Sequence, residues 1–222
     1  MVVVVLLVAA VFAQRSSHSG GDHRPALVVG DSVVALAARA ANTGPVHLVG
    51  YPGLNPDVFT GPTARLLPDD LAAAGHPHTV VLNWNGNNPR GLPGIALLAD
   101  YRADLTEQIR WYQAHGVTRI VLAAALPSAF NNAGHQVDPA SPDAGRPGWM
   151  LGSPRLNDLY RQLAAAYPGS VRYSDHAARA IQPAMGFTTA LDGHRCIADF
   201  VHPTPYCAAR YARALAALAS DD

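Results

Sequence analysis

Short apolar segments alternate with longer amphipathic segments along most of this 222-residue chain. The apolar segments predict strands at residues 27–29, 46–49, 78–82, 120–122 and 171–173. The amphipathic segments predict helices at about residues 33–41, 66–74, 95–115, 153–167 and 205–219. Strands that alternate with helices of about ten residues or more favour a parallel sheet with helices on both faces. We therefore expect an α/β fold, a three-layer α/β/α sandwich around a sheet of about five strands.

The composition excludes several classes of function. Lys and Arg together (16) equal Asp and Glu together (16), so the overall charge gives no general case for binding nucleic acid or an anionic membrane. Every basic residue is Arg, and every acidic residue except Glu107 is Asp. A chain without lysine lacks a P-loop lysine, a Schiff-base amine and a Ser-Lys dyad, and one glutamate cannot build a Glu-rich di-metal bundle. His76 and His78 have metal-like spacing but lie at the amino end of a strand and lack a third ligand, so we expect neither a metal site nor a cofactor.

The N-terminal segment predicts export. Residues 2–12 form an unbroken apolar run that is shorter than the roughly 20 residues of a bilayer-spanning helix. Ala13 then supplies a small residue where a signal peptidase would cut. We predict a signal peptide at 1–13, a flexible leader at 14–24 and one domain at 25–222, hence a secreted or cell-envelope protein with no stable membrane insertion after cleavage. No positive charge precedes the run, and a buried first strand is the alternative.

The chain has two cysteines, Cys196 and Cys207. An even count in an exported protein permits one disulfide, which for a loop of this size would add about 3 kcal/mol. Two unpaired thiols are the alternative. The pair has no Cys-x-x-Cys or metal-ligand spacing, which excludes a zinc ribbon and a thioredoxin-like site.

Polar residues follow the first three predicted strands, at the sheet edge where ligands bind. The first strand runs into Gly-Asp-Ser at 30–32, which places a serine where free N–H groups and the helix dipole favour a developing negative charge. Gly-Tyr-Pro-Gly follows the second strand at 50–53, where a glycine N–H can face a ligand. Asn-Trp-Asn-Gly-Asn-Asn at 83–88 ends the third strand and can aim a side-chain amide at an oxyanion. Taken singly, an ordinary helix cap and two plain turns are the alternatives.

Asp199 and His202 stand three residues apart, just before the last predicted helix. At this spacing the aspartate can hold one ring nitrogen of the histidine and leave the other as a general base. A structural His–Asp contact is the alternative.

The order of these groups resembles that of the SGNH (GDSL-type) hydrolase family, whose blocks are Gly-Asp-Ser, a glycine, Gly-x-Asn and a terminal Asp-x-x-His. The likeness spans about residues 26–219, and it implies the flavodoxin-like parallel sheet of that family. Val33 stands where the family name has leucine. The Gly-x-Ser-x-Gly elbow of the α/β-hydrolase fold is absent, which separates the two families of serine hydrolase.

The resemblance implies a role for each block. Ser32 would be the nucleophile, His202 its general base, and Asp199 the acid that orients the base. The backbone N–H groups of Ser32 and Gly53 would belong to the oxyanion hole.

The third block departs from the family pattern and leaves two candidates for the remaining oxyanion donor. Aligned with the family's Gly-Gly-Asn-Asp, the block has Asn85 in place of the first glycine and makes Asn87 the donor. Read literally as Gly-x-Asn, it makes Asn88 the donor. We prefer Asn87.

Three further residues, Asp31, Trp84 and Trp149, are candidates for the substrate pocket. Asp31 precedes the serine and Trp84 lies beside the oxyanion turn, where it either lines the pocket or packs beneath it. Trp149 belongs to a loop rich in Pro, Gly, Asn and Asp at 130–152, of a length that often forms a lid.

These residues together predict a secreted serine esterase that hydrolyses short-chain acyl esters, O-acetyl carbohydrates among them, through an acyl-serine intermediate. Its partner is then a small-molecule or carbohydrate ester, and we expect a monomer that binds no nucleic acid. An O-acyltransferase that uses the same acyl-serine, and a non-catalytic carbohydrate-binding module of the same fold, are the alternatives.

Overall fold

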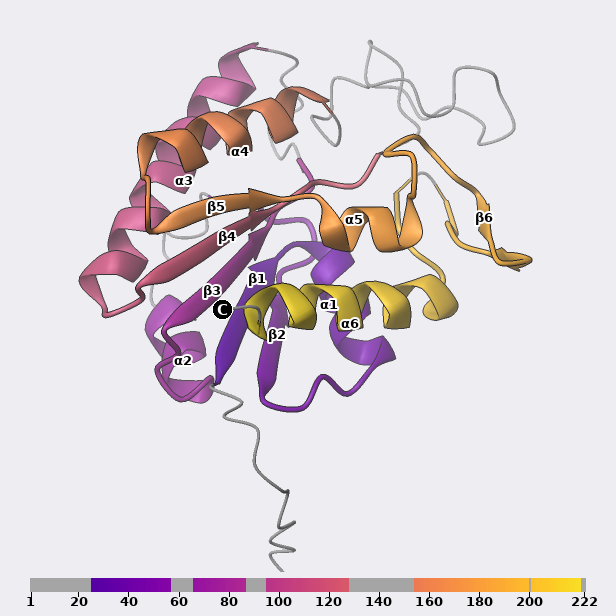
Figure 1. Ribbon diagram of the computed structural model, residues 1–222, viewed down its shortest axis with the longest axis horizontal. Helices are drawn as coiled ribbons and strands as arrows, with labels where there is room; N and C mark the ends of the chain where they lie inside the picture. The colour runs from indigo at the N-terminus through magenta and orange to yellow at the C-terminus, as the bar shows by residue number, and fades with distance from the viewer. Residues whose placement is uncertain (1–24, 57–65, 87–94, 128–153, 200, 221–222) are drawn as a thin grey trace, which may run out of the picture.

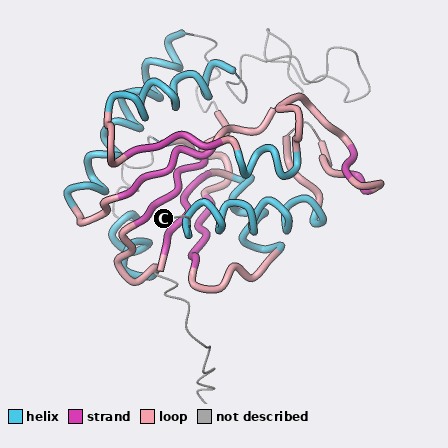
Figure 2. Tube along the Cα trace, viewed as in Figure 1, coloured by secondary structure: helices cyan, strands magenta, loops and turns pink. Residues whose placement is uncertain are grey.

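The computed structural model describes residues 25–56, 66–86, 95–127, 154–199 and 201–220 (Figures 1 and 2). Their strands are β1 (Ala26–Gly30), β2 (Val46–Gly50), β3 (Thr79–Asn83), β4 (Arg119–Ala123), β5 (Val171–Ser174), β6 (Ala190–Leu191) and β7 (His194–Arg195). Their helices are α1 (Ser32–Ala40), α2 (Leu66–Ala73), α3 (Ile95–Ala114), α4 (Pro154–Ala166), α5 (His176–Ile181) and α6 (Pro205–Ser220). Each strand and helix that the sequence predicts is present, and its ends differ from the prediction by one residue at most.

The main sheet has five parallel strands in the order β2-β1-β3-β4-β5. Ala26 of β1 pairs with Val46 of β2 on one side and with Thr79 of β3 on the other. The strand order therefore reverses between β1 and β3, and ligands of such sheets bind beyond the carboxyl ends of the strands at that reversal. The predicted α/β fold with a flavodoxin-like parallel sheet is confirmed.

Alternate residues of each strand face opposite helical layers. Leu27 and Val29 of β1 pack in the core under α2, α3 and α4. Val28, between them, packs in the core under α1, α5 and α6. Figure 1 shows α6, in yellow, crossing in front of the sheet on the second of these faces. Because both faces are covered, the three central strands β1, β3 and β4 are buried along almost their whole length, which explains their hydrophobic runs in the sequence.

Two glycines at the carboxyl edge of the sheet let neighbouring segments approach closely. Gly30 ends β1 and Gly50 ends β2, and the two residues pair across the strands. A Cβ on Gly30 would lie 2.1 Å from the carbonyl oxygen of Asn83, and one on Gly50 would lie 2.1 Å from the backbone nitrogen of Ala35 in α1. Both positions therefore require glycine, and Gly50 fixes how closely α1 sits against β2.

The segment between β5 and α6 holds elements that the sequence analysis does not predict. Helix α5 has six residues, and the hairpin β6–β7 has two residues in each strand. Asp192 and Gly193 join the two strands with φ values of 51° and 77°. Two successive positive φ values are typical of a tight hairpin turn, for which Asp-Gly is a strong sequence signal.

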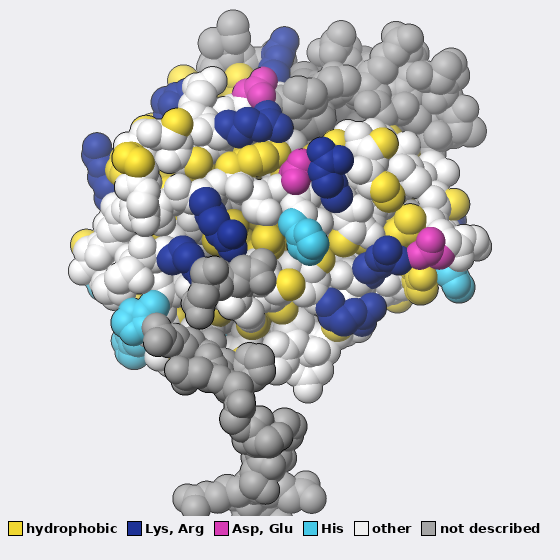
Figure 3. Space-filling view, in the orientation of Figure 1, with side chains coloured by type: hydrophobic (Ala, Val, Ile, Leu, Met, Phe, Trp, Pro, Cys, Tyr) yellow, Lys and Arg dark blue, Asp and Glu magenta, His cyan; other side chains and the backbone are white. Residues whose placement is uncertain are grey.

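On the face shown in Figure 3, arginine side chains are spread among uncharged ones, and each acidic side chain visible there lies beside an arginine. The ion pairs among the described residues include Arg161–Asp158, Arg179–Asp175 and Arg210–Asp192. Within the part of the chain that the structure describes, no helix is both long enough and apolar enough to cross a membrane.

Candidate active site

Three side chains from opposite ends of the domain form a chain of hydrogen bonds. Ser32 is the first residue of α1, directly beyond the carboxyl end of β1. Its Oγ lies 2.8 Å from Nε2 of His202, 170 positions later in the sequence. Nδ1 of the same ring lies 2.8 Å from Oδ2 of Asp199. With Asp199 holding the proton on Nδ1, Nε2 is free to accept the proton of the serine hydroxyl.

The Asp199 carboxylate organises the turn that carries the histidine. Its Oδ1 accepts hydrogen bonds from the backbone N–H groups of Val201 and His202, each at 3.0 Å. Partial burial acts to raise the pKa of Asp199, but these two backbone bonds and the bond to the His202 ring outweigh it and hold the pKa below its ordinary value. Asp199 is therefore ionised at neutral pH, the state that stabilises a positive charge on the imidazole.

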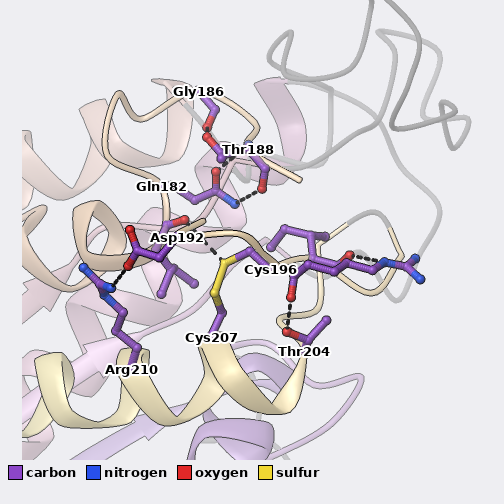
Figure 4. Close-up of a disulfide and its surroundings, with 11 residues drawn as sticks. Gln182, Gly186, Thr188, Asp192, Cys196, Thr204, Cys207 and Arg210 are labelled. Carbon is purple, nitrogen blue, oxygen red and sulfur yellow. Dashed lines mark hydrogen bonds and ion pairs between the residues drawn. A yellow bond between two sulfur atoms is a disulfide. The ribbon is translucent and has the colours of Figure 1, made fainter. Parts of the chain in front are cut away.

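A disulfide ties the loop that carries this turn to α6, and an arginine braces the loop from within. Cys196 and Cys207 are joined, as predicted, which ties the start of the loop to the first turns of α6 (Figure 4). The hydroxyl of Thr204 donates to the carbonyl oxygen of Arg195 at 2.6 Å, and its N–H donates to that of Cys196 at 2.8 Å. The Arg195 guanidinium bonds the carbonyl oxygens of Ile197 and Ala198.

The far end of α6 is also anchored. Arg119 donates to the carbonyl oxygen of Ala219 at 2.8 Å, and Arg172 donates to that of Leu218 at 2.9 Å. These carbonyls belong to the last turn of the helix, where cations are favoured because the helix dipole is negative there. Both ends of the helix that follows His202 are therefore held.

On the serine side of the site, Asp31 is buried. The prediction that it lines a substrate pocket is therefore wrong. Its side chain is 1% exposed and accepts three hydrogen bonds. The donors are Val33 N at 3.0 Å, Asn85 N at 2.7 Å and Asn85 Nδ2 at 3.1 Å. Asp31 thus caps α1 and joins it to the segment after β3. Burial raises the pKa of Asp31, although these hydrogen bonds act to lower it.

Asn85 is a site residue whose function the sequence analysis misses. Besides its bonds to Asp31, its Nδ2 donates to Oδ1 of Asn83 at 3.2 Å, and its Oδ1 accepts from Leu126 N at 2.8 Å. It therefore links the segments that follow β1, β3 and β4. The third block places an asparagine where the family has glycine, and that departure is the signal that could have marked it.

No family model matches the chain, and no curated protein matches it in sequence. Solved structures do match it. A protein from Slackia heliotrinireducens assigned to the SGNH hydrolases matches with a TM-score of 0.54 and 17% identity, over 86% of this chain and 96% of the other. The fold is that of the SGNH hydrolases. A GDSL-like lipase from Bacteroides thetaiotaomicron is also similar, with a TM-score of 0.53 and 14% identity over 85% of this chain and 84% of its own.

Two of the expected oxyanion donors, the N–H groups of Ser32 and Gly53, lie within the described residues. Ser32 N–H lies in the first turn of α1, where N–H groups have no partner inside the helix, since the first helical bond runs from Ala35 N to the Asp31 carbonyl. Gly53 is exposed, with φ at 77°, in a turn closed by Leu54 N bonding the Tyr51 carbonyl. The N–H of Gly53 takes no part in that closing bond.

The other predicted site residues lie either outside the described part of the chain or in the hydrophobic core. Asn87, Asn88 and Trp149 fall outside the described residues, as do the predicted signal peptide and leader. Trp84 is fully buried in the core instead of lining a pocket, and its Nε1 donates to Oε1 of Gln108 at 3.2 Å. Among the described residues, no group of three or more His, Cys, Asp or Glu is arranged to hold a metal ion.

Proposed function

We propose that this chain is a serine hydrolase that cleaves carboxylic esters through an acyl-Ser32 intermediate. The observation that carries the proposal is the pair of 2.8 Å contacts that join Ser32 to His202 and His202 to Asp199. A nucleophile, a base and an orienting acid within hydrogen-bond reach are the geometric signature of this chemistry. The SGNH fold of the chain supports the same conclusion.

The geometry supports a two-step reaction. Ser32 Oγ attacks the acyl carbon while His202 Nε2 takes its proton, and the imidazolium then gives that proton to the departing alcohol. Water, deprotonated by the same nitrogen, attacks the acyl-serine and releases the acid. Asp199 stays ionised throughout and stabilises the ring each time it becomes cationic.

The tetrahedral intermediate carries its negative charge beside the start of α1. We assign the N–H of Ser32 to the oxyanion hole because the helix dipole adds a positive potential at that point. Gly53 N–H and the side chain of Asn87 are the further donors that we propose. Loss of one such donor generally costs about 3 kcal/mol of transition-state stabilisation.

We further propose that the enzyme acts outside the cytoplasm on short-chain acyl esters, with O-acetyl groups on carbohydrates as the first substrates to test. The Cys196–Cys207 disulfide supports an oxidising location, since such bonds are rare in reducing compartments. The apolar run at residues 2–12 supports export.

The decisive experiment labels the protein with a fluorophosphonate and measures hydrolysis of a chromogenic acetate ester. Wild-type protein takes up one label per chain, at Ser32, and hydrolyses the ester. Ser32→Ala and His202→Ala each lose both properties, because they remove the nucleophile and its base. Ser220→Ala is the matched control, since its hydroxyl is exposed and bonds the carbonyl oxygen of Ala216 in its own helix. Labelling of the Ser32→Ala protein at the wild-type rate contradicts the proposal.

A further inference from the structure

Tyr51 attaches the turn that carries Gly53 to the rest of the domain, and the two-step reaction makes no use of its side chain. It directly follows β2, at the sheet edge where Ser32 begins α1. We propose that Tyr51, held by Asp70 of α2, is a positioning residue that fixes the Gly53 N–H in the oxyanion hole. The inference rests on the proposed function, because that function assigns the Gly53 N–H as an oxyanion donor.

The turn after β2 has the residues of a type II β-turn. It runs from Tyr51 through Pro52 and Gly53 to Leu54, whose N–H donates to the Tyr51 carbonyl oxygen at 3.1 Å. Proline at the second position and a glycine with φ of 77° at the third are typical of this turn type. The N–H of Gly53 belongs to the peptide between these two central residues and takes no part in the closing bond. Its direction is therefore set by the orientation of the turn as a whole.

The backbone of Tyr51 joins this turn to the strand that leads to the nucleophile. Its N–H donates to the Gly30 carbonyl oxygen at 2.8 Å. Gly30 ends β1 two residues before Ser32, and it pairs with Gly50, the residue before Tyr51. A shift of Tyr51 along the strand direction would therefore change the separation between Ser32 and Gly53, whose two N–H groups must meet at one oxyanion.

The side chain of Tyr51 ties the same turn to α2. Its ring is half-buried against the core under α2, α3 and α4, and its hydroxyl donates to Oδ2 of Asp70. Burial, together with the hydrogen bond to Asp70, raises the pKa of Tyr51, so the hydroxyl keeps its proton at neutral pH and acts as the donor. Tyr51 is thus held at its backbone by β1 and at the tip of its side chain by α2. A displacement of the residue must break one of these bonds.

Tyr173 offers a matched case at the other edge of the sheet. It lies on β5, which is separated from β2 by the three central strands. Its ring is also half-buried, and its hydroxyl accepts a hydrogen bond from Arg161 at 3.3 Å. Replacement of either tyrosine by phenylalanine removes one side-chain hydrogen bond and keeps the ring, but only Tyr51 is attached to a proposed oxyanion donor.

The experiment measures kcat and KM for hydrolysis of the chromogenic acetate ester by Tyr51→Phe, Asp70→Ala and Asp70→Asn, with Tyr173→Phe as the control. Loss of an oxyanion donor generally lowers kcat by about 10²–10³-fold, and a donor that is only displaced should cost less. We expect Tyr51→Phe and Asp70→Ala to lower kcat by about tenfold with KM within about twofold, since the oxyanion is absent from the bound substrate. Asp70→Asn keeps an oxygen that accepts from the hydroxyl and should retain most of the activity.

The Tyr173→Phe protein should hydrolyse the ester at about the wild-type rate. A fall of kcat in this variant equal to that in Tyr51→Phe overturns the proposal, because the effect would then come from lost packing in general. Wild-type kcat in Tyr51→Phe overturns it as well. The double variant Tyr51→Phe/Asp70→Ala should be no slower than either single variant, since each removes the same hydrogen bond. Losses that multiply in the double variant contradict the assignment to one contact.

A second measurement follows the Gly53 amide by NMR in protein labelled at glycine, with its signal assigned from a Gly53→Ala variant. The signal moves in Tyr51→Phe and Asp70→Ala and keeps its wild-type position in Tyr173→Phe. A wild-type position in all three variants overturns the proposal. A wild-type protein that neither hydrolyses the ester nor takes up the fluorophosphonate contradicts the proposed function instead, and the Gly53 signal then still decides whether Tyr51 holds the turn.

Discussion

The two halves of the proposed catalytic site are held in different ways. Ser32 begins a helix that packs on the sheet, and the residues around it, Asp31 and Asn85, are almost completely buried. His202 lies in a loop outside the sheet, where its side chain is 28% exposed. The serine is positioned by the core, whereas the histidine is positioned by a disulfide, an arginine and a turn that Asp199 closes. The comparison indicates that Ser32 can shift only if α1 shifts on the sheet. His202, in contrast, depends on contacts within its own loop and on the disulfide to α6.

The largest effect should come from the core side. Gly50→Ala places a Cβ where it would lie 2.1 Å from Ala35 N, so α1 must move away from β2. We expect a loss of about 3 kcal/mol or more in the free energy of unfolding, together with lower activity because Ser32 moves with the helix. Chemical denaturation and ester hydrolysis measure the two effects.

Gly193→Ala is the matched control in the hairpin near the histidine loop. Gly193 has φ at 77°, but a Cβ there would meet nothing within 4 Å. We expect a cost of about 1 kcal/mol, from backbone strain alone. An equal loss of unfolding free energy in Gly50→Ala and Gly193→Ala would contradict the inference that the serine side is held by the core and the histidine side is not.

The next effect tests the covalent support of the histidine. Replacement of both Cys196 and Cys207 by serine removes a cross-link between residues 11 positions apart, which should lower the free energy of unfolding by about 2–3 kcal/mol. Activity should fall as well, because the loop that carries His202 loses its tie to α6. The measurements are thermal unfolding and ester hydrolysis, with labelling of Ser32 as a check that the core half is intact. Unchanged stability and activity would show that the disulfide does not hold the His202 loop in place.

The smallest effect concerns Asp199, whose pKa is lowered on folding. Its contribution to stability is present above its unfolded pKa of about 3.9 and is lost as the pH falls through the folded value. Asp199→Asn should therefore be less stable than wild type at neutral pH, by less than about 1 kcal/mol because the group is partly exposed to solvent. The difference should shrink as the pH is lowered below about 4.

Denaturant unfolding from acidic to neutral pH measures this trend for Asp199→Asn. For Asp31 we expect the opposite dependence of stability on pH. Burial raises the pKa of Asp31, so its contribution to stability is greatest at low pH and declines as the pH rises through the folded value. The wild type should therefore lose stability relative to Asp31→Ser as the pH rises. Parallel trends in the Asp199 and Asp31 variants would contradict the contrast between a partly exposed and a buried carboxylate.

Much of the architecture could be predicted from the sequence because the apolar central strands are buried on both faces and all five strands of the sheet alternate with helices of regular period. Helix α5 escaped prediction because six residues are too few to show a helical period. The hairpin β6–β7 carried a usable signal, the Asp-Gly pair at its turn. The longer helices and the sheet strands show a regular hydrophobic period in the sequence, whereas the short elements between β5 and α6 are marked at most by single residues.

The site divides in the same way. The order of Gly-Asp-Ser and Asp-x-x-His pointed to the three side chains that the structure brings together. Asp31 and Asn85 lie 54 positions apart and meet only where two strand ends come together, so the sequence marks Asn85 by its departure from the family's glycine but does not show its partner. The complete burial of Trp84 likewise follows from its place under α3 and α4 and not from its neighbours in the sequence.

The clamp that Arg119 and Arg172 place on the last turn of α6 has a practical consequence. A helix of 16 residues is about 24 Å long, so this clamp and the histidine lie at opposite ends of one rigid rod. Trimming the chain before Leu218, or fusing a tag inside that final turn, would release the helix at its distant end. Engineering of the C-terminal region should therefore leave Leu218 and Ala219 in place, even though they are far from the chemistry.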